Sequence, residues 1–257
     1  MPYFDTSTNK DKNPTVDLRT MASDTPLTLY FSDRLGFWQK KWETNKIGFH
    51  NEEVNEMLAN HADKLIGSNK PRNIFVPLCG KSVDMKWFAD QGIETVGVDV
   101  IPMALEQFFT DHNMEWEEAN MPALGPNGKL LSSKTHPIKL YCADIVNYSV
   151  EIDGHFDAVW DRGSISALYR GDLDTYLSLM KNLVRPGGRI LMEVVQYDVS
   201  IMDDLDRPTK PPPPYPLYEE DLNKMYGPEF SVHFLERRGW KLAGKDIEQA
   251  LYLLLRN

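Results

Sequence analysis

The sequence predicts an α/β protein with a mainly parallel sheet of seven strands and helices on both faces of that sheet. Strand-like and helix-like segments alternate from about residue 73 onward, which is the pattern of parallel strands joined by crossover helices. Helical patterns also precede the first strand, so a helical segment is expected outside the sheet. A length of 257 residues with 42% apolar residues suits one such domain with a full core.

The N-terminal part divides into a tail and a lid. Residues 1–28 are rich in Thr, Ser, Asp, Asn and Pro and are expected to form a flexible tail before a domain at 29–257. Trp38 and Trp42 are four residues apart and therefore share one helix face. Apolar residues continue at helical spacing to Leu65. We expect this segment to close over a site as a lid; the alternative is that the two tryptophans are core anchors.

The strands and helices of the sheet follow in regular order. The predicted strands cover 73–76, 95–99, 138–142, 156–160, 189–195, 230–236 and 250–255. The predicted helices cover 83–91, a segment opening at Pro102, the apolar face from Leu173 to Val184, and 219–225.

Two segments predict irregular structure. Residues 114–134 contain the turn signals Pro122, Gly125-Pro126 and Asn127-Gly128, so they are expected to lack regular strands. The stretch 197–217 contains four consecutive prolines ending at Pro214, which predicts a stiff extended loop.

Charge and cysteine content narrow the classes of function. A net charge of −10 argues against binding to nucleic acid or to an anionic membrane, because both attract Lys and Arg. Two cysteines cannot form a disulfide framework, and they suit a reducing cytosol. No apolar stretch approaches the ~20 residues of a membrane span, and no hydrophobic signal core is found near the N-terminus. We therefore expect a soluble cytoplasmic protein.

A glycine turn and an acidic strand end predict a nucleotide-like ligand. Gly80 follows the first strand, and Asp99 ends the second, 19 residues later. In a βαβ unit such a glycine lets a ligand approach the backbone, and such a carboxylate binds ribose hydroxyls. The sequence lacks Gly-x-Gly-x-x-Gly, so a pyrophosphate would be poorly held. An adenosine without a diphosphate is the better fit, and S-adenosylmethionine is such a ligand.

Further polar residues follow the third and fourth strands. Asp144 and Ile145 are suited to an adenine, since a carboxylate accepts from its amino group and an aliphatic chain packs on its ring. Asp144 is equally suited to a helix cap. Arg162 could recognise an anionic or polar substrate, or it could pair internally with its neighbour Asp161. Because parallel strands bind ligands beyond their carboxyl ends, these residues are expected to share one pocket.

Other kinds of site find little support. The six histidines and two cysteines show no His-x-x-x-His or Cys-x-x-Cys spacing, so no metal site is expected. No Gly-x-Ser-x-Gly elbow is present. Cys79 lies beside the glycine turn, where a small packed residue is the simpler interpretation.

Several short strings resemble one family of enzymes. They are Trp38-x-x-x-Trp42, Phe49-His50, Pro77-Leu78-Cys79-Gly80-Lys81, the run 85–90, Gly97-Val98-Asp99 and Trp160-Asp161-Arg162-Gly163. Together they resemble thiopurine S-methyltransferase, from about residue 37 to the C-terminus. The resemblance implies a Rossmann-like class I methyltransferase fold and S-adenosyl-L-methionine as cofactor. It also implies a monomeric cytoplasmic enzyme of xenobiotic metabolism that methylates thiopurines and other aromatic or heterocyclic thiols.

The resemblance also implies roles for particular residues. The residues expected to contact or flank the cofactor are Trp38, Trp42, Leu78, Gly80, Asp99, Asp144, Ile145 and Arg162. The residues expected to wall or orient the substrate are Phe49, Arg162, Pro213 and Pro214. Arg162 is the expected catalytic residue. The acid at position 99 is Asp where the mammalian enzyme has Glu, and Asp144 replaces a serine. Roles for Arg237 and Arg238 are left open.

Three other functions remain open at this stage. The acceptor could instead be a chalcogen compound, thiocyanate, a halide or a small thiol. The chain could bind the cofactor without catalysis, as a regulatory ligand. A nicotinamide dehydrogenase is disfavoured because the glycine set is missing.

Overall fold

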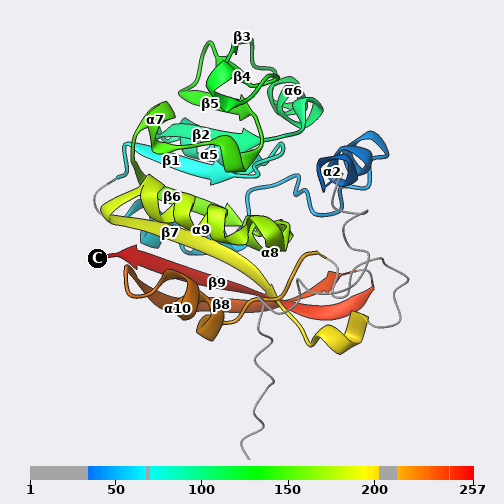
Figure 1. The fold of residues 1–257 in the computed structure, drawn as a ribbon, viewed down its shortest axis with the longest axis vertical. Helices are drawn as coiled ribbons and strands as arrows, with labels where there is room; N and C mark the ends of the chain where they lie inside the picture. The colour runs from blue at the N-terminus through cyan, green and yellow to red at the C-terminus, as the bar shows by residue number, and fades with distance from the viewer. Residues whose placement is uncertain (1–33, 68–69, 203–212, 243) are drawn as a thin grey trace, which may run out of the picture.

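The described residues of this computed structural model, 34–67, 70–202, 213–242 and 244–257, form a nine-stranded mixed sheet (Figure 1). Its strand order is β3-β4-β5-β2-β1-β6-β7-β9-β8. The central, mutually parallel strands are β5 (Ile138–Cys142), β2 (Glu94–Asp99), β1 (Asn73–Pro77), β6 (Phe156–Arg162) and β7 (Val184–Gln196). The expected α/β class with a mainly parallel centre is thus confirmed. The expected tail at 1–28 and residues 203–212 of the expected proline loop lie outside the described residues.

The expectation of seven strands is wrong by one hairpin. Residues 114–134, expected to be irregular, contain β3 (Trp116–Asn120) and β4 (Lys129–Ser133), which pair antiparallel at the edge of the sheet. All residues of β3 after Trp116 are exposed, so the strand lacks the alternation of apolar and polar residues that a half-buried strand shows. The turn signals themselves were correct, because η2 (Pro122–Leu124) and Gly125 lie between the two strands.

The opposite edge of the sheet is a long antiparallel hairpin. It consists of β8 (Phe230–Leu242) and β9 (Lys245–Arg256), and both strands are longer than expected. The strand expected at 189–195 also begins earlier, at Val184, and passes through the Pro186-Gly187-Gly188 turn. The register between β6 and β7 shifts there, so the turn forms an irregularity within the strand.

Helices cover both faces of the sheet because its strands are apolar on both sides. Ile74 and Val76 of β1 pack with α5 (Val83–Asp90) and α6 (Pro102–Asp111). Phe75, between them, faces the cluster that includes α9 (Leu173–Leu183) and α10 (Glu219–Tyr226). This alternation follows the two-residue period of a strand. No helix in the described part of the chain is both long and apolar enough to cross a membrane.

The N-terminal segment lies beside the sheet, as expected. Helix α2 (Arg34–Glu43) lies near the ends toward which the arrows of β1 and β2 point (Figure 1). The helical pattern expected to run on to residue 65 is divided into α3 (Glu56–Asn60) and α4 (Ala62–Ile66), with His61 between them in a non-helical conformation. The Asn55 side chain accepts a bond from the Leu58 backbone and so starts α3. After α2 the chain therefore enters α3 at Asn55, and α3 and α4 lead on to β1.

Candidate functional site

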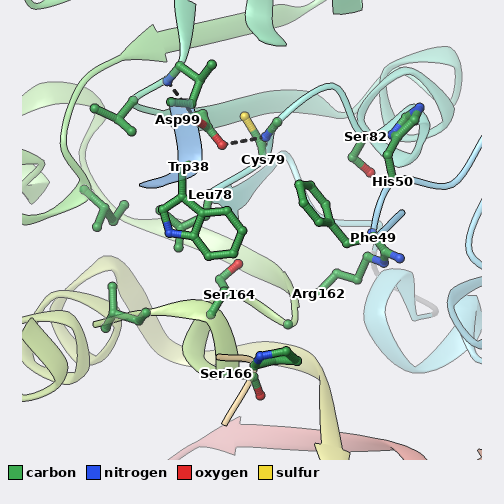
Figure 2. Close-up of a pocket in the computed structure, with 18 of the residues that line it drawn as sticks. Trp38, Phe49, His50, Leu78, Cys79, Ser82, Asp99, Arg162, Ser164 and Ser166 are labelled. Atoms are coloured by element: carbon green, nitrogen blue, oxygen red, sulfur yellow. Dashed lines mark hydrogen bonds between the residues drawn. The ribbon is translucent and has the colours of Figure 1, made fainter. Parts of the chain in front are cut away.

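A cavity of about 210 Å³ lies beyond the carboxyl ends of the parallel strands (Figure 2). Its wall combines the turn after β1, the end of β2, the turn after β5, the end of β6 and the last residues of β7. Strand order reverses between β1 and β6, and open parallel sheets bind ligands at such switch points. Residues 35–50 close one side of the cavity, and residues of the β8–β9 hairpin close another.

The turn after β1 is built for a close backbone approach. Leu78 and Gly80 both have positive φ, at 43° and 49°, a conformation that is uncommon for a leucine. A Cβ at position 80 would lie 3.0 Å from the ring of Trp42. The Gly80 backbone nitrogen donates to Asp99 Oδ2 at 2.8 Å. Glycine is therefore required here both for φ and for the room that Trp42 leaves.

Asp99 joins this turn to the next helix. Its other oxygen, Oδ1, accepts from the Ile101 backbone nitrogen at 3.0 Å, and the residue is only 8% exposed. Burial raises the pKa of the Asp99 carboxyl, and the bonds from the backbone of Ile101 and Gly80 oppose that rise. Figure 2 shows these bonds at the upper wall of the cavity. A carboxylate oxygen has further lone pairs, so Asp99 can still accept from a ligand hydroxyl.

The turn after β5 supplies Asp144 and Ile145 to the same cavity. The Asp144 side chain also accepts from the Val146 backbone nitrogen at 3.3 Å, where it caps η3 (Ile145–Asn147). Asp144 therefore both caps η3 and lines the cavity. Ile145 is 2% exposed and presents an apolar surface.

Aromatic side chains from the N-terminal segment form a roof. Trp38 and Trp42 each make an edge contact with Phe49, with ring centroids 5.7 and 6.1 Å apart. Trp42 is buried against Ile101 and Ala104 at the start of α6, whereas Trp38 is half-buried. The tryptophans are therefore part of a small apolar cluster and also line the cavity.

His50 adds a nitrogen heterocycle to the same wall. Burial lowers the pKa of the His50 imidazole, and the positive charges of Lys81 and Arg162 lower it further. Both effects favour the uncharged form of the ring.

Arg162 faces Glu193 and not its sequence neighbour Asp161. Asp161 turns away from it and accepts from the Tyr176 hydroxyl at 2.7 Å and from the Ser164 backbone at 2.9 Å. Arg162 faces Glu193, with 3.9 Å between Arg162 Nε and Glu193 Oε1. The two residues are register partners on the neighbouring parallel strands β6 and β7. The alternative of an internal pair with Asp161 is not seen, because adjacent residues of a strand point to opposite faces.

Several residues of the cavity wall were missed from the sequence. Glu193, Ser166, Trp240 and Gln249 all line it. Glu193 was the one with a visible signal, since it is the lone charge in the apolar run 190–195 of β7. The Ser166 hydroxyl is buried and has no hydrogen-bond partner among the described residues. It lies at the lower end of the cavity in Figure 2.

The remaining residues singled out from the sequence differ in whether they line the cavity. Pro214 lines the cavity, whereas Pro213, joined to it by a cis peptide, does not. Arg237 faces Glu248 at 3.6 Å, and Arg238 contacts Gln249 and Glu56, so neither reaches the cavity wall. Cys79 is buried in the wall, where burial raises the pKa of its thiol well above the ordinary range. Such a thiol is a poor nucleophile.

Within the described residues, no group of three His, Cys, Asp or Glu side chains could hold a metal ion.

Comparison with known proteins gives both family and fold. The sequence profile of the thiopurine S-methyltransferase family matches residues 33–248. Thiopurine S-methyltransferases from Lycaon pictus and Bos taurus are each 35% identical to this chain over 201 residues, which is 78% of this chain and 78% of each relative.

Solved structures with low sequence identity share the fold. The 1,6-didemethyltoxoflavin-N1-methyltransferase of Burkholderia thailandensis superposes with a TM-score of 0.57 at 15% identity, covering 91% of this chain and 92% of that one. Magnesium protoporphyrin IX methyltransferase from Synechocystis PCC 6803 has the same TM-score at 11% identity, covering 88% of this chain and 100% of that one. The sheet therefore has the architecture of class I methyltransferases.

Proposed function

Because the chain belongs to the thiopurine S-methyltransferase family, we propose that it methylates the sulfur of thiopurines and of other aromatic or heterocyclic thiols. It is an S-adenosylmethionine-dependent methyltransferase. One observation carries the choice of site: the family's Pro-Leu-Cys-Gly-Lys and Trp-Asp-Arg-Gly strings both end at the same cavity. The cavity lies where the strand order of the parallel sheet reverses, between β1 and β6, and ligands bind at that position in this class of fold.

The described residues fit an adenosine cofactor. The turn at 78–82 lines the cavity with a glycine that carries no side chain, and a buried carboxylate lies next to that turn. When bound, S-adenosylmethionine supplies a methyl group whose carbon bonds to the substrate sulfur as the carbon–sulfonium bond breaks, leaving neutral S-adenosylhomocysteine. We assign the ribose hydroxyls to Asp99, the adenine to Asp144 and Ile145, and the amino-acid part to the turn that contains Leu78 and Gly80.

The aromatic roof would then close over the cofactor. Trp38 and Trp42 present ring faces and edges to the cavity, and an aromatic ring near a sulfonium is favourable through cation–π attraction. Closing the cavity also excludes water, which strengthens every electrostatic contact inside it.

Substrate would occupy the part of the cavity near Arg162. The Nε of Arg162 has no hydrogen-bond partner among the described residues, so it can donate to a substrate. Phe49 and Pro214 supply apolar surface for a flat ring, and Pro213 precedes Pro214 through a cis peptide. Arg162 would orient the substrate and favour its thiolate form, whose proton is released to solvent. An aromatic thiol ionises readily near neutral pH, so positioning can supply much of the rate.

Two measurements test the proposed function. Calorimetry with S-adenosylhomocysteine should give saturable binding that Asp99→Ala weakens. Purified protein should then transfer label from S-adenosylmethionine to a thiopurine or thiophenol, and more slowly to thiocyanate, iodide or a small aliphatic thiol. Binding without transfer to any thiol would identify a regulatory cofactor-binding protein. Preferred transfer to an inorganic acceptor would replace the substrate class but keep the site.

The setting of the enzyme is part of the same proposal. The net charge of −10, together with two free buried cysteines, supports a cytoplasmic enzyme of xenobiotic metabolism, acting as a monomer without nucleic-acid or membrane partners. Residues 29–257 would form its single catalytic domain behind the tail at 1–28. Light scattering on the purified protein in solution should give one mass near 29.5 kDa, and twice that mass would contradict the monomer.

A further inference from the structure

Glu193 is a buried carboxylate in the wall of the cavity. It lies near the carboxyl end of β7, and its side chain is 5% exposed. Its Oε2 accepts from Asn55 Nδ2 at 2.7 Å, and its Oε1 accepts from Gln249 Nε2 at 2.8 Å. A charge in such a position costs free energy unless something compensates it, so its presence in the cavity wall needs an explanation.

The two amides that hold Glu193 are themselves held. Asn55 Oδ1 accepts from the Leu58 backbone at 3.0 Å, so the Asn55 amide nitrogen must point toward Glu193. Gln249 Oε1 accepts from Arg238 Nε at 3.2 Å, which fixes the Gln249 amide in the same way. Both Glu193 oxygens are therefore acceptors, held by donors from an N-terminal turn and from β9. The carboxylate cannot swing toward Arg162 without losing one of these bonds.

The relation of Glu193 to Arg162 is one of charge without a hydrogen bond. The closest approach is 3.9 Å, too long for a hydrogen bond, and Arg162 Nε has no partner among the described residues. Glu193 thus offsets the positive charge of Arg162 but leaves its donors to face the cavity. The pair therefore presents hydrogen-bond donors to the cavity, with a positive charge that Glu193 reduces.

We propose that Glu193 is a specificity-determining residue, which makes the substrate end of the cavity select aromatic thiols without a second negative charge. This inference rests on the proposed function. A substrate bearing a carboxylate or phosphate would gain from Arg162 and lose to Glu193, since like charges in a buried site repel strongly. A neutral heterocycle would use the Arg162 donors and avoid that repulsion. The structure thereby favours free bases and neutral thiophenols as substrates.

The test compares thiosalicylate with its methyl ester, which differ by one carboxylate charge. Wild-type protein and Glu193→Gln are assayed for kcat/KM with both thiols. In parallel, binding of both thiols to protein saturated with S-adenosylhomocysteine is measured by calorimetry. In Glu193→Gln the preference for thiosalicylate over the ester should rise about tenfold or more, in binding as well as in turnover, because removing about 1.4 kcal/mol of repulsion gives that factor. Glu118→Gln, which removes the same charge from the exposed strand β3, should leave the preference unchanged.

Two further variants separate selectivity from damage. Glu193→Met removes the charge without adding an amide, so it should change the preference in the same direction. Glu193→Asp keeps the charge, so its preference between thiosalicylate and the ester should stay near that of the wild type. An unchanged preference in both neutral variants, with S-adenosylhomocysteine affinity intact, overturns the inference. Failure of the wild type to methylate either thiol overturns the proposed function instead, while the binding preference still decides the role of Glu193.

Discussion

Asp99 already accepts two backbone hydrogen bonds before any ligand is considered. They hold the turn after β1 against the start of α6, so the residue that we assign to the ribose also shapes the floor of the cofactor site. A change at Asp99 therefore acts twice, on a contact to the ligand and on the turn that carries Gly80.

Asp99→Ala should weaken S-adenosylhomocysteine binding by about 1–3 kcal/mol, the range for losing a hydrogen bond to a charged group. Calorimetry measures this directly. Asp111→Ala is the matched control, because Asp111 pairs with Lys81 of the same turn at 2.8 Å but does not line the cavity. If the two variants bind equally well, Asp99 has no ribose role.

Arg162→Ala should lower kcat/KM for thiols far more than it weakens cofactor binding. The reason is the unpartnered Nε beside the substrate wall. Arg162→Lys should recover only part of the activity, since an ammonium lacks the planar fork of donors. Kinetics under cofactor saturation, with calorimetry beside them, separate the two effects. Lost cofactor affinity with unaffected kcat/KM at saturation would assign Arg162 to the cofactor alone.

At the scale of the element, α2 and the residues after it are attached to the sheet through few contacts. Trp42 and Phe49 join a small cluster with Ile101 and Ala104, separate from the two main clusters of the core. Small satellite clusters open at lower free energy than a core, which is the property that a lid requires.

Binding of S-adenosylhomocysteine should therefore slow amide exchange in residues 37–50 and leave residues 1–28 in fast exchange. Deleting residues 1–28 should leave activity nearly intact, and deleting through Trp42 should abolish it. Hydrogen exchange followed by mass spectrometry resolves the first point, and labelled methyl transfer the second. Full activity in the longer deletion would mean that the tryptophans only anchor the segment.

At the scale of the whole molecule, Asp161 makes folding stability depend on pH. Burial raises the pKa of its carboxyl from 3.8 to about 6. The folded state therefore binds more protons than the unfolded chain between these values, so the contribution to stability is complete below about pH 4 and is lost as pH rises through 6. The total change is about 3 kcal/mol. Chemical unfolding across this range, compared with Asp161→Asn, measures it; parallel curves for the two proteins would contradict the assignment.

How well the sequence predicts the strands and the site residues depends on which neighbours each residue contacts. The five parallel strands were found because strands buried on both faces are continuously apolar. The β3–β4 hairpin was missed because residues such as Glu117 and Glu118 are exposed and carry no burial signal. Asp99, Asp144 and Arg162 were found because they lie at or just after strand ends, which the local sequence order indicates.

Gln249, Trp240 and the pairing of Arg162 with Glu193 depend on register across the sheet. Register is set by the packing of distant segments, so a single sequence gives no direct sign of it. Glu193, although missed, was the exception, because a lone charge in the buried run 190–195 indicates a partner even when the partner is unknown.

The cavity draws on residues from Leu35 to Gln249, and this has a consequence for how the protein is made. On the ribosome, the turn that contains Gly80 emerges well before Gln249, whose amide donates to Glu193. A nascent or truncated chain that ends before the β8–β9 hairpin would carry that turn but would lack the Gln249 donor to the Glu193 carboxylate. If Glu193 selects the substrate as proposed, such a chain would lack the arrangement that chooses between thiols.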